Sequence, residues 1–180
     1  MSIMSLSTQS KKNNLRYLII FALLGAIMFI SKILMEALPN VHLLGALTMT
    51  YTLVYRWRAL IPIYLYVFLN GLFAGFNTWW IPYLYIWTIL WAATMLLPKK
   101  MPPWICRIVF PLLCAAHGLL YGVLYAPAQA IMFGMNFQQM LAWVSTGLPF
   151  DLLHAVGNLV AGLLIYPLSE LLKKLEKTQK

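Results

Sequence analysis

The sequence predicts an all-α integral membrane protein with six transmembrane helices and with both termini in the cytoplasm. Three observations support this prediction: the composition, the spacing of the apolar runs and the placement of the basic residues. Of the 180 residues, 62% are hydrophobic and only 9% are charged, and the mean hydropathy is +0.79. Soluble domains have about 45–50% apolar and about 25% charged residues. The composition therefore excludes an ordinary soluble domain and is typical of a polytopic membrane protein.

Six apolar segments are the candidate spans: residues 15–38, 42–55, 59–76, 80–97, 105–125 and 149–172. A spanning helix needs about 20 such residues, and the second segment is short. No small-residue cleavage site follows the first segment, which indicates a retained helix and not a signal peptide. Residues 126–148 contain Gly134, Asn136 and Gln138 and are predicted to be a long connection, with a short amphipathic helix at 137–145. The membrane domain thus covers 15–172, between cytoplasmic tails at 1–14 and 173–180.

The basic residues fall on one side of this six-helix arrangement. Twelve of the 13 Lys and Arg lie in, or next to, the N-terminal tail, the connections after the second and fourth segments, and the C-terminal tail. They are Lys11, Lys12, Arg16, Arg56, Arg58, Lys99, Lys100, Arg107, Lys173, Lys174, Lys177 and Lys180. The exception is Lys32. Because cytoplasmic loops are enriched in Lys and Arg, both termini are predicted to be cytoplasmic. Lys32 lies four residues before Glu36, a spacing that allows an ion pair. The alternative is that one of these two residues contacts a polar ligand.

Uncharged polar and aromatic residues collect in the three predicted outer connections. The candidate ligand-binding residues there are Asn40 and His42 in the first, Asn77, Trp79 and Trp80 in the second, and Gln129 and Asn136 in the third. Rings supply contact area and amides fix orientation, so this chemistry suits a large, flat and mostly neutral organic ligand. The alternative for the two tryptophans is an aromatic belt at the membrane surface.

A polar stripe marks the last segment. Asp151, His154 and Asn158 lie at i, i+3 and i+7, which places them on one helix face. Polar groups inside a membrane are costly, so Asp151 and His154 are further candidates for ligand binding, with Asp151 able to orient His154 by a hydrogen bond. Asp151 alternatively caps the N-terminus of its own helix. His117 and Gly118 of the fifth segment are expected to meet this stripe.

Signals for catalysis and for metal binding are poor. The sequence has no GxSxG, no HExxH and no Walker A lysine loop, and its three histidines do not have the spacing of a zinc site. We therefore expect no catalytic residue, no metal and no bound cofactor. Cys106 and Cys114 are expected to be buried thiols. Two alternatives are a small intramembrane enzyme that uses Asp151 and His154, and a scaffold protein without a ligand.

Small residues four apart in the first segment, Ala22 and Ala26, form a groove into which a partner helix can pack. Together with the chain length, the six helices, the cytoplasmic termini and the elaborate outer loops, this pattern resembles the S components of energy-coupling factor (ECF) transporters. The resemblance implies a vitamin-binding subunit of the bacterial plasma membrane. It also implies that Ala22 and Ala26 dock on the coupling subunit EcfT, through which two EcfA-type ATPases supply the energy, and that the loaded subunit topples in the membrane.

Four stretches resemble the subgroup associated with cobalamin, called CbrT: Pro39–Leu43, Trp79–Tyr83, Ala126–Ala130 and Gly147–Asp151. This resemblance implies cobalamin as the transported substrate. The alternative within the family is another vitamin or precursor, such as dimethylbenzimidazole, riboflavin or a queuosine precursor.

Overall fold

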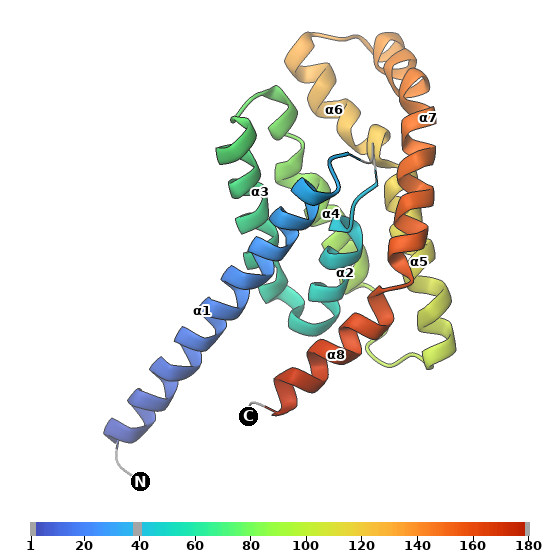
Figure 1. The fold of residues 1–180 in the computed structure, drawn as a ribbon. Helices are drawn as coiled ribbons and strands as arrows, with labels where there is room; N and C mark the ends of the chain where they lie inside the picture. The colour runs from blue at the N-terminus through green and yellow to red at the C-terminus, as the bar shows by residue number, and fades with distance from the viewer. Residues whose placement is uncertain (1–2, 38–40, 179–180) are drawn as a thin grey trace.

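The computed structural model of the chain describes residues 3–37 and 41–178. Within these residues it is all-helical, with eight α-helices, two short 3-10 helices and no strand (Figure 1). The elements are α1 (Ile3–Leu34), α2 (Leu44–Tyr55), η1 (Arg56–Ala59), α3 (Leu60–Ala74), η2 (Thr78–Trp80), α4 (Tyr83–Met95), α5 (Pro103–Leu119), α6 (Tyr121–Phe133), α7 (Phe137–Gly162) and α8 (Ile165–Thr178).

Several of these helices are long and apolar enough to cross a membrane. Three helical runs qualify by length and composition: Asn14–Leu34, Leu44–Ala74 and Pro103–Phe133. The second run contains α2, η1 and α3, with a change of backbone conformation at Arg56, and the third contains α5 and α6. Helices α7 and α8 make a fourth if they count together as one span bent by 44°. Large apolar side chains such as Leu18 and Leu23 of α1 and Val156 of α7 are more than half exposed on the outer surface. Such a surface is suited to lipid. The predicted all-helical class is confirmed, with three or four helical runs able to span a membrane.

The prediction of a long connection at 126–148 is wrong. Helix α6 continues to Phe133, and α7 begins at Phe137. The polar residues that indicated a loop instead end one helix and begin the next. Gly134 closes α6 in the left-handed conformation, with φ 62°. Asn136 accepts a hydrogen bond from the backbone N–H of Gln139, and the Gln139 side chain accepts one from the backbone N–H of Asn136, which is a complete capping box.

One predicted segment differs from the structure. The segment 149–172 is not one helix, because α7 begins well before it and the chain bends between Gly162 and Ile165. The segment 105–125 lies within the membrane-length run Pro103–Phe133, in which a turn at Leu120 separates α5 from α6. The first membrane-length run begins at Asn14, next to the predicted start at 15, although α1 itself begins at Ile3.

Helix α2 is the centre of the structure, and every residue from Leu44 to Thr52 is buried. Leu44, Leu47 and Tyr51 pack in one apolar cluster with residues of α1, α3 and α4. Ala46 and Met49 pack in a second cluster with residues of α4, α5, α7 and α8, which includes both buried cysteine thiols. The predicted burial of the two thiols is therefore confirmed, and α2 joins the two halves of the bundle.

Glycines allow close packing of α5 and α6 on α7. A Cβ atom added to Gly118 would lie 2.8 Å from the carbonyl oxygen of His154, and one added to Gly162 would lie 2.6 Å from the Cα atom of Pro111. One added to Gly122 would collide with the carboxylate of Asp151. Small residues are what let membrane helices approach at such distances. The predicted meeting of Gly118 with the polar stripe of α7 is confirmed.

We predict that Gly118→Leu and Gly162→Leu each lower the free energy of unfolding by about 1–3 kcal/mol or prevent folding, because the added side chain meets backbone and not a flexible side chain. Thermal unfolding of the purified chain in detergent measures this. The control is Gly147→Leu in α7, because a Cβ atom there meets nothing within 4 Å. Equal unfolding temperatures for all three variants would contradict the tight contact.

Candidate ligand-binding cleft

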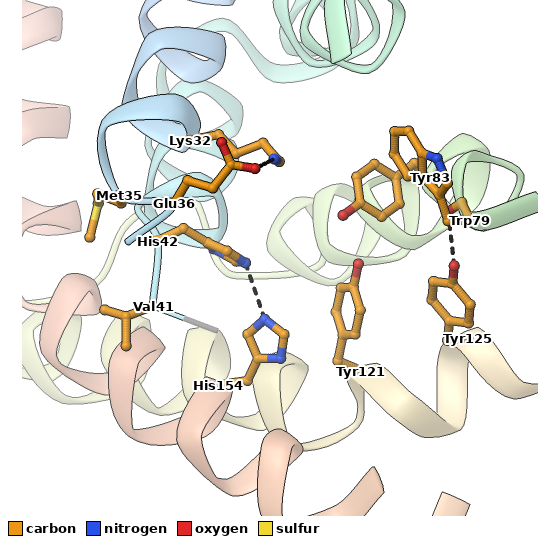
Figure 2. Close-up of a pocket in the computed structure, with 10 residues that line it drawn as sticks. All are labelled: Lys32, Met35, Glu36, Val41, His42, Trp79, Tyr83, Tyr121, Tyr125 and His154. Carbon is orange, nitrogen blue, oxygen red and sulfur yellow. Dashed lines mark hydrogen bonds and ion pairs between the residues drawn. The ribbon is translucent and has the colours of Figure 1, made fainter. Parts of the chain in front are cut away.

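Two neighbouring cavities form the candidate site. Their volumes are about 330 Å³ and about 420 Å³. Both are lined by Trp79, Tyr121, Tyr125 and His154, so they are compartments of one depression, which we call the aromatic cleft. The first cavity is completed by Lys32, Met35, Glu36, Val41, His42 and Tyr83 (Figure 2), and the second by Thr78, Gly122, Gln129, Phe133, Trp143, Gly147, Phe150 and Asp151.

Helix periodicity explains why these side chains converge. Tyr121 and Tyr125 lie one turn apart on α6 and present their rings to the cleft. On α7 the lining residues Trp143, Gly147 and His154 recur at intervals of four and seven residues, so they follow one face. The Gly122 contact with α7 brings these two faces together.

The rings of the cleft contact one another and form a continuous wall. Trp143 stacks on Tyr125 with 5.9 Å between the ring centroids, and Tyr121 lies 4.8 Å from the ring of His154. On the opposite side Trp79 packs edge-on against Tyr83 at 5.5 Å. The Tyr125 hydroxyl donates a hydrogen bond to the Trp79 carbonyl at 2.9 Å, which ties α6 to the connection between α3 and α4. Aromatic groups arranged in this way offer flat apolar contact area with polar edges.

His42 and His154 connect the loop before α2 to α7. Their Nε2 atoms lie 3.1 Å apart, and whichever ring is protonated at Nε2 donates the hydrogen bond (Figure 2). Burial, together with the nearby His154, lowers the pKa of His42 to about 3. His42 is therefore neutral at pH 7, and a neutral ring can serve as donor or acceptor in this pair.

Asp151 is bound to a neighbouring helix. Its Oδ1 atom accepts a hydrogen bond from the backbone N–H of Gly122 at 3.0 Å, in the first turn of α6. The prediction that Asp151 caps its own helix is wrong, because Asp151 lies inside α7. The carboxylate instead satisfies an N–H that has no partner within α6, and its charge complements the positive end of the α6 dipole. His154 is hydrogen-bonded to His42, and the structure gives no support to the predicted bond between Asp151 and His154.

One ion pair borders the first cavity. Lys32 near the end of α1 lies 3.7 Å from the carboxylate of Glu36, which confirms the predicted i,i+4 pair. Figure 2 shows both side chains on the same side of the cavity as His42. Because the two charges compensate each other, the first cavity carries little net charge. A ligand with one polar substituent could still bind to either partner.

The structure brings five of the nine predicted ligand-binding residues to the cleft: His42, Trp79, Gln129, Asp151 and His154. Three others, Asn77, Trp80 and Asn136, do not line it, and Asn40 lies outside the described residues.

Two of these exceptions have a structural role. The indole N–H of Trp80 donates to the carbonyl of Val67 at 2.8 Å, and its ring packs edge-on against Phe76. Asn136 is the cap of α7, as described above, while Asn77 is exposed in the turn before η2. His117 is buried, with its Nε2 atom 3.2 Å from the Ile86 carbonyl, which is a packing role.

Sequence reasoning missed four rings of the wall: Tyr83, Tyr121, Tyr125 and Trp143. The i,i+4 spacing of Tyr121 and Tyr125 was a usable signal. In the six-segment prediction both tyrosines fall at the end of the span 105–125. Trp143 falls in the predicted connection 126–148, which the structure shows to be helical at this position.

The predicted docking pair occupies a different surface. Ala22 is exposed and lines an apolar groove of about 490 Å³ between α1, η1 and α3, and Ala26 is half-buried. Gly25 beside them faces inward, where an added Cβ would lie 2.8 Å from Leu65. The small residues of α1 thus divide between packing on α3 and an open groove.

The residues that the structure describes contain no group of three or more His, Cys, Asp or Glu able to hold a metal ion. Comparison of the chain with protein-family models, with curated proteins and with solved structures found no match.

We predict that Asp151→Ala lowers the free energy of unfolding by about 0.5–2 kcal/mol, the usual cost of removing an N-terminal cap. Asp151→Asn should retain most of the stability, because its amide oxygen can still accept from Gly122. Thermal unfolding of the three proteins measures the difference. If Asn and Ala prove equally destabilising, charge and not the hydrogen bond is the contribution of this residue.

Proposed function

We propose that this chain is the substrate-binding S component of an ECF-type importer and that the aromatic cleft binds a vitamin or vitamin precursor with a planar ring system. One observation carries the proposal: four side chains, Trp79, Tyr121, Tyr125 and His154, are shared by two adjoining cavities with aromatic walls. Sites for small organic ligands are concave, mostly apolar and about 300–1,000 Å³ in volume, with a few polar groups that orient the ligand.

The proposed topology has six spans: α1, α2, α3, α4, α5 with α6, and α7 with α8. Both termini lie in the cytoplasm of a bacterium and the cleft faces outward. Figure 1 supports this arrangement, because the start of α1 and the end of α8 lie at one end of the bundle, while α6 and the start of α7 lie at the other. The basic residues Arg56, Lys99 and Lys173 gather at the end of the termini. Positive charge on that side is what the cytoplasmic orientation requires.

The chemistry of the cleft favours a largely neutral ligand. Rings of Trp79, Tyr121 and Tyr125 can stack on a planar group, and Gln129 and the histidine pair offer hydrogen bonds. Cobalamin is the first ligand to test because of the sequence resemblance. It would extend over both cavities and out of their mouth. Riboflavin, dimethylbenzimidazole and a queuosine precursor are alternatives whose ring systems match one cavity.

The proposed importer also includes EcfT and two EcfA-type ATPases. The open groove beside Ala22 is the surface proposed for EcfT, since an apolar groove next to small residues allows a partner helix to approach closely. In this scheme the chain supplies specificity, the ATPases supply the energy, and toppling of the loaded subunit turns the cleft inward.

Binding is favoured over catalysis by the partners of the two groups that an enzyme would use. The Asp151 carboxylate is hydrogen-bonded to the start of α6, and His154 is hydrogen-bonded to His42. A general base needs to be within hydrogen-bond reach of the proton that it abstracts from the substrate. In this structure both side chains instead connect elements of the cleft.

We predict that one compound of a vitamin panel raises the unfolding temperature of the detergent-purified chain. At 100 times its dissociation constant a ligand adds about 2.7 kcal/mol of stability. Trp79→Ala should weaken binding of that compound by about 1–3 kcal/mol, because the ring lines both cavities. Trp80→Ala is the matched control and should reduce stability without a comparable loss of affinity. A panel without any stabilising compound would contradict the proposal, and recovery of a chemically altered compound would favour the enzyme.

We also predict that Ala22→Trp combined with Ala26→Trp abolishes vitamin uptake into proteoliposomes that contain the whole importer, because the bulky rings fill the groove. Ligand binding by the isolated chain should be unchanged, since neither alanine lines the cleft. Ile27→Trp, on another exposed face of the same helix, is the control and should support uptake. Full uptake by the double variant would refute the docking role, and loss of binding as well would assign the pair to packing.

A further inference from the structure

A third cavity lies at the opposite end of the bundle from the aromatic cleft. Its volume is about 530 Å³, and it is bounded by the end of α2, the connection between α4 and α5, the start of α5, and α8. Three cations line it, Arg56, Lys99 and Lys173, together with one acidic residue, Glu170. The Glu170 carboxylate accepts a hydrogen bond from Lys173 at 2.8 Å. The cavity lining contains no second acid to compensate the charges of Arg56 and Lys99.

Arg56 occupies a strained position at this cavity. Among the described residues it alone has a positive φ without being glycine, with φ 55° and ψ −124°. Such a conformation is costly for a residue with a side chain and persists only where the surroundings fix it. Here the Arg56 carbonyl accepts from the Trp91 indole at 3.1 Å, and the guanidinium Nη2 donates to the Met95 carbonyl at 2.9 Å. These two hydrogen bonds fix Arg56 at the cavity, and backbone outliers of this kind are concentrated at functional sites.

We propose that this cavity binds a phosphate group, carried either by the headgroup of an anionic phospholipid or by a free phosphate compound. A guanidinium offers several donors in one plane and each ammonium adds a compact charge, which together match a tetrahedral oxyanion. The same cavity has apolar lining from Leu53, Met101 and Phe110, which suits the glycerol and chain portion of a lipid. Basic pockets between helices on the cytoplasmic side are where anionic headgroups bind. The inference rests on the proposed cytoplasmic orientation of this end of the bundle, but not on the vitamin or on the importer.

The test uses the full chain in a neutral detergent. Its unfolding temperature is measured while phosphatidylglycerol is titrated, with phosphatidylcholine as the uncharged comparison, and in a separate series with inorganic phosphate against chloride at equal ionic strength. The cavity variant is Lys99→Gln with Lys173→Gln. The control variant is Lys100→Gln with Lys174→Gln, which removes the same charge from the neighbouring positions, neither of which lines the cavity.

We expect phosphatidylglycerol to raise the unfolding temperature more than phosphatidylcholine does. The apparent affinity for phosphatidylglycerol should fall about tenfold in the cavity variant, as the loss of charge-assisted contacts implies, and should stay near the wild-type value in the control. A response to inorganic phosphate alone, with the same dependence on Lys99 and Lys173, supports the site and identifies a free phosphate compound as its source. An equal loss of affinity in both double variants would show that general surface charge causes the binding, and would overturn the proposal. The absence of any response to either probe would also overturn it.

Discussion

The close contact of α5 and α6 with α7 is the constraint on which the rest of this structure depends. Gly118 and Gly162 let backbone meet backbone, and Gly122 leaves room for the Asp151 carboxylate. A membrane offers little hydrophobic driving force between helices, so tight packing and interhelical hydrogen bonds have to supply the attraction. The register of this contact also decides that His154 and the tyrosines of α6 face the same cavity. The packing of α5 and α6 on α7 therefore also forms the aromatic cleft.

Several polar side chains join the helices of this chain. Asp151 binds the start of α6, the Asn158 amide donates to the Cys114 carbonyl, and His42 pairs with His154. A polar group buried among apolar side chains is stabilised by a partner and costly without one. The bonds of Asp151, His42 and His154 place polar edges of the cleft, whose charged groups are the Lys32–Glu36 pair and the Asp151 carboxylate. A ligand would then meet preformed hydrogen-bonding groups between rings, which reduces the entropy lost on binding.

The two ends of the bundle differ in chemistry, and α2 separates them. Rings, amides and a compensated ion pair form the cleft at one end, whereas three cations surround the cavity at the other. The buried α2 contributes to both apolar clusters and ends at Arg56, beside the basic cavity. The two proposals, an organic ligand in the cleft and a phosphate group in the basic cavity, follow from this difference in chemistry.

Composition and charge placement alone predicted an all-helical membrane protein with basic residues at one end. The free energy of transferring a side chain from water into a membrane depends on the residue type and not on its tertiary contacts. The i,i+4 spacing likewise predicted the pair of Lys32, in the last turn of α1, and Glu36, in the turn that follows this helix. The partner of Asp151 lies 29 residues away in the sequence and that of His42 lies 112 away, so only the tertiary structure decided them. It also decided that Gly134 ends α6 and that Asn136 begins α7, since the same residue types occur in loops and in caps. The extension of α6 and α7 through this region forms the walls of the cleft. Local sequence preference sets where a helix can stop, whereas packing sets which face of a helix contacts a neighbouring helix.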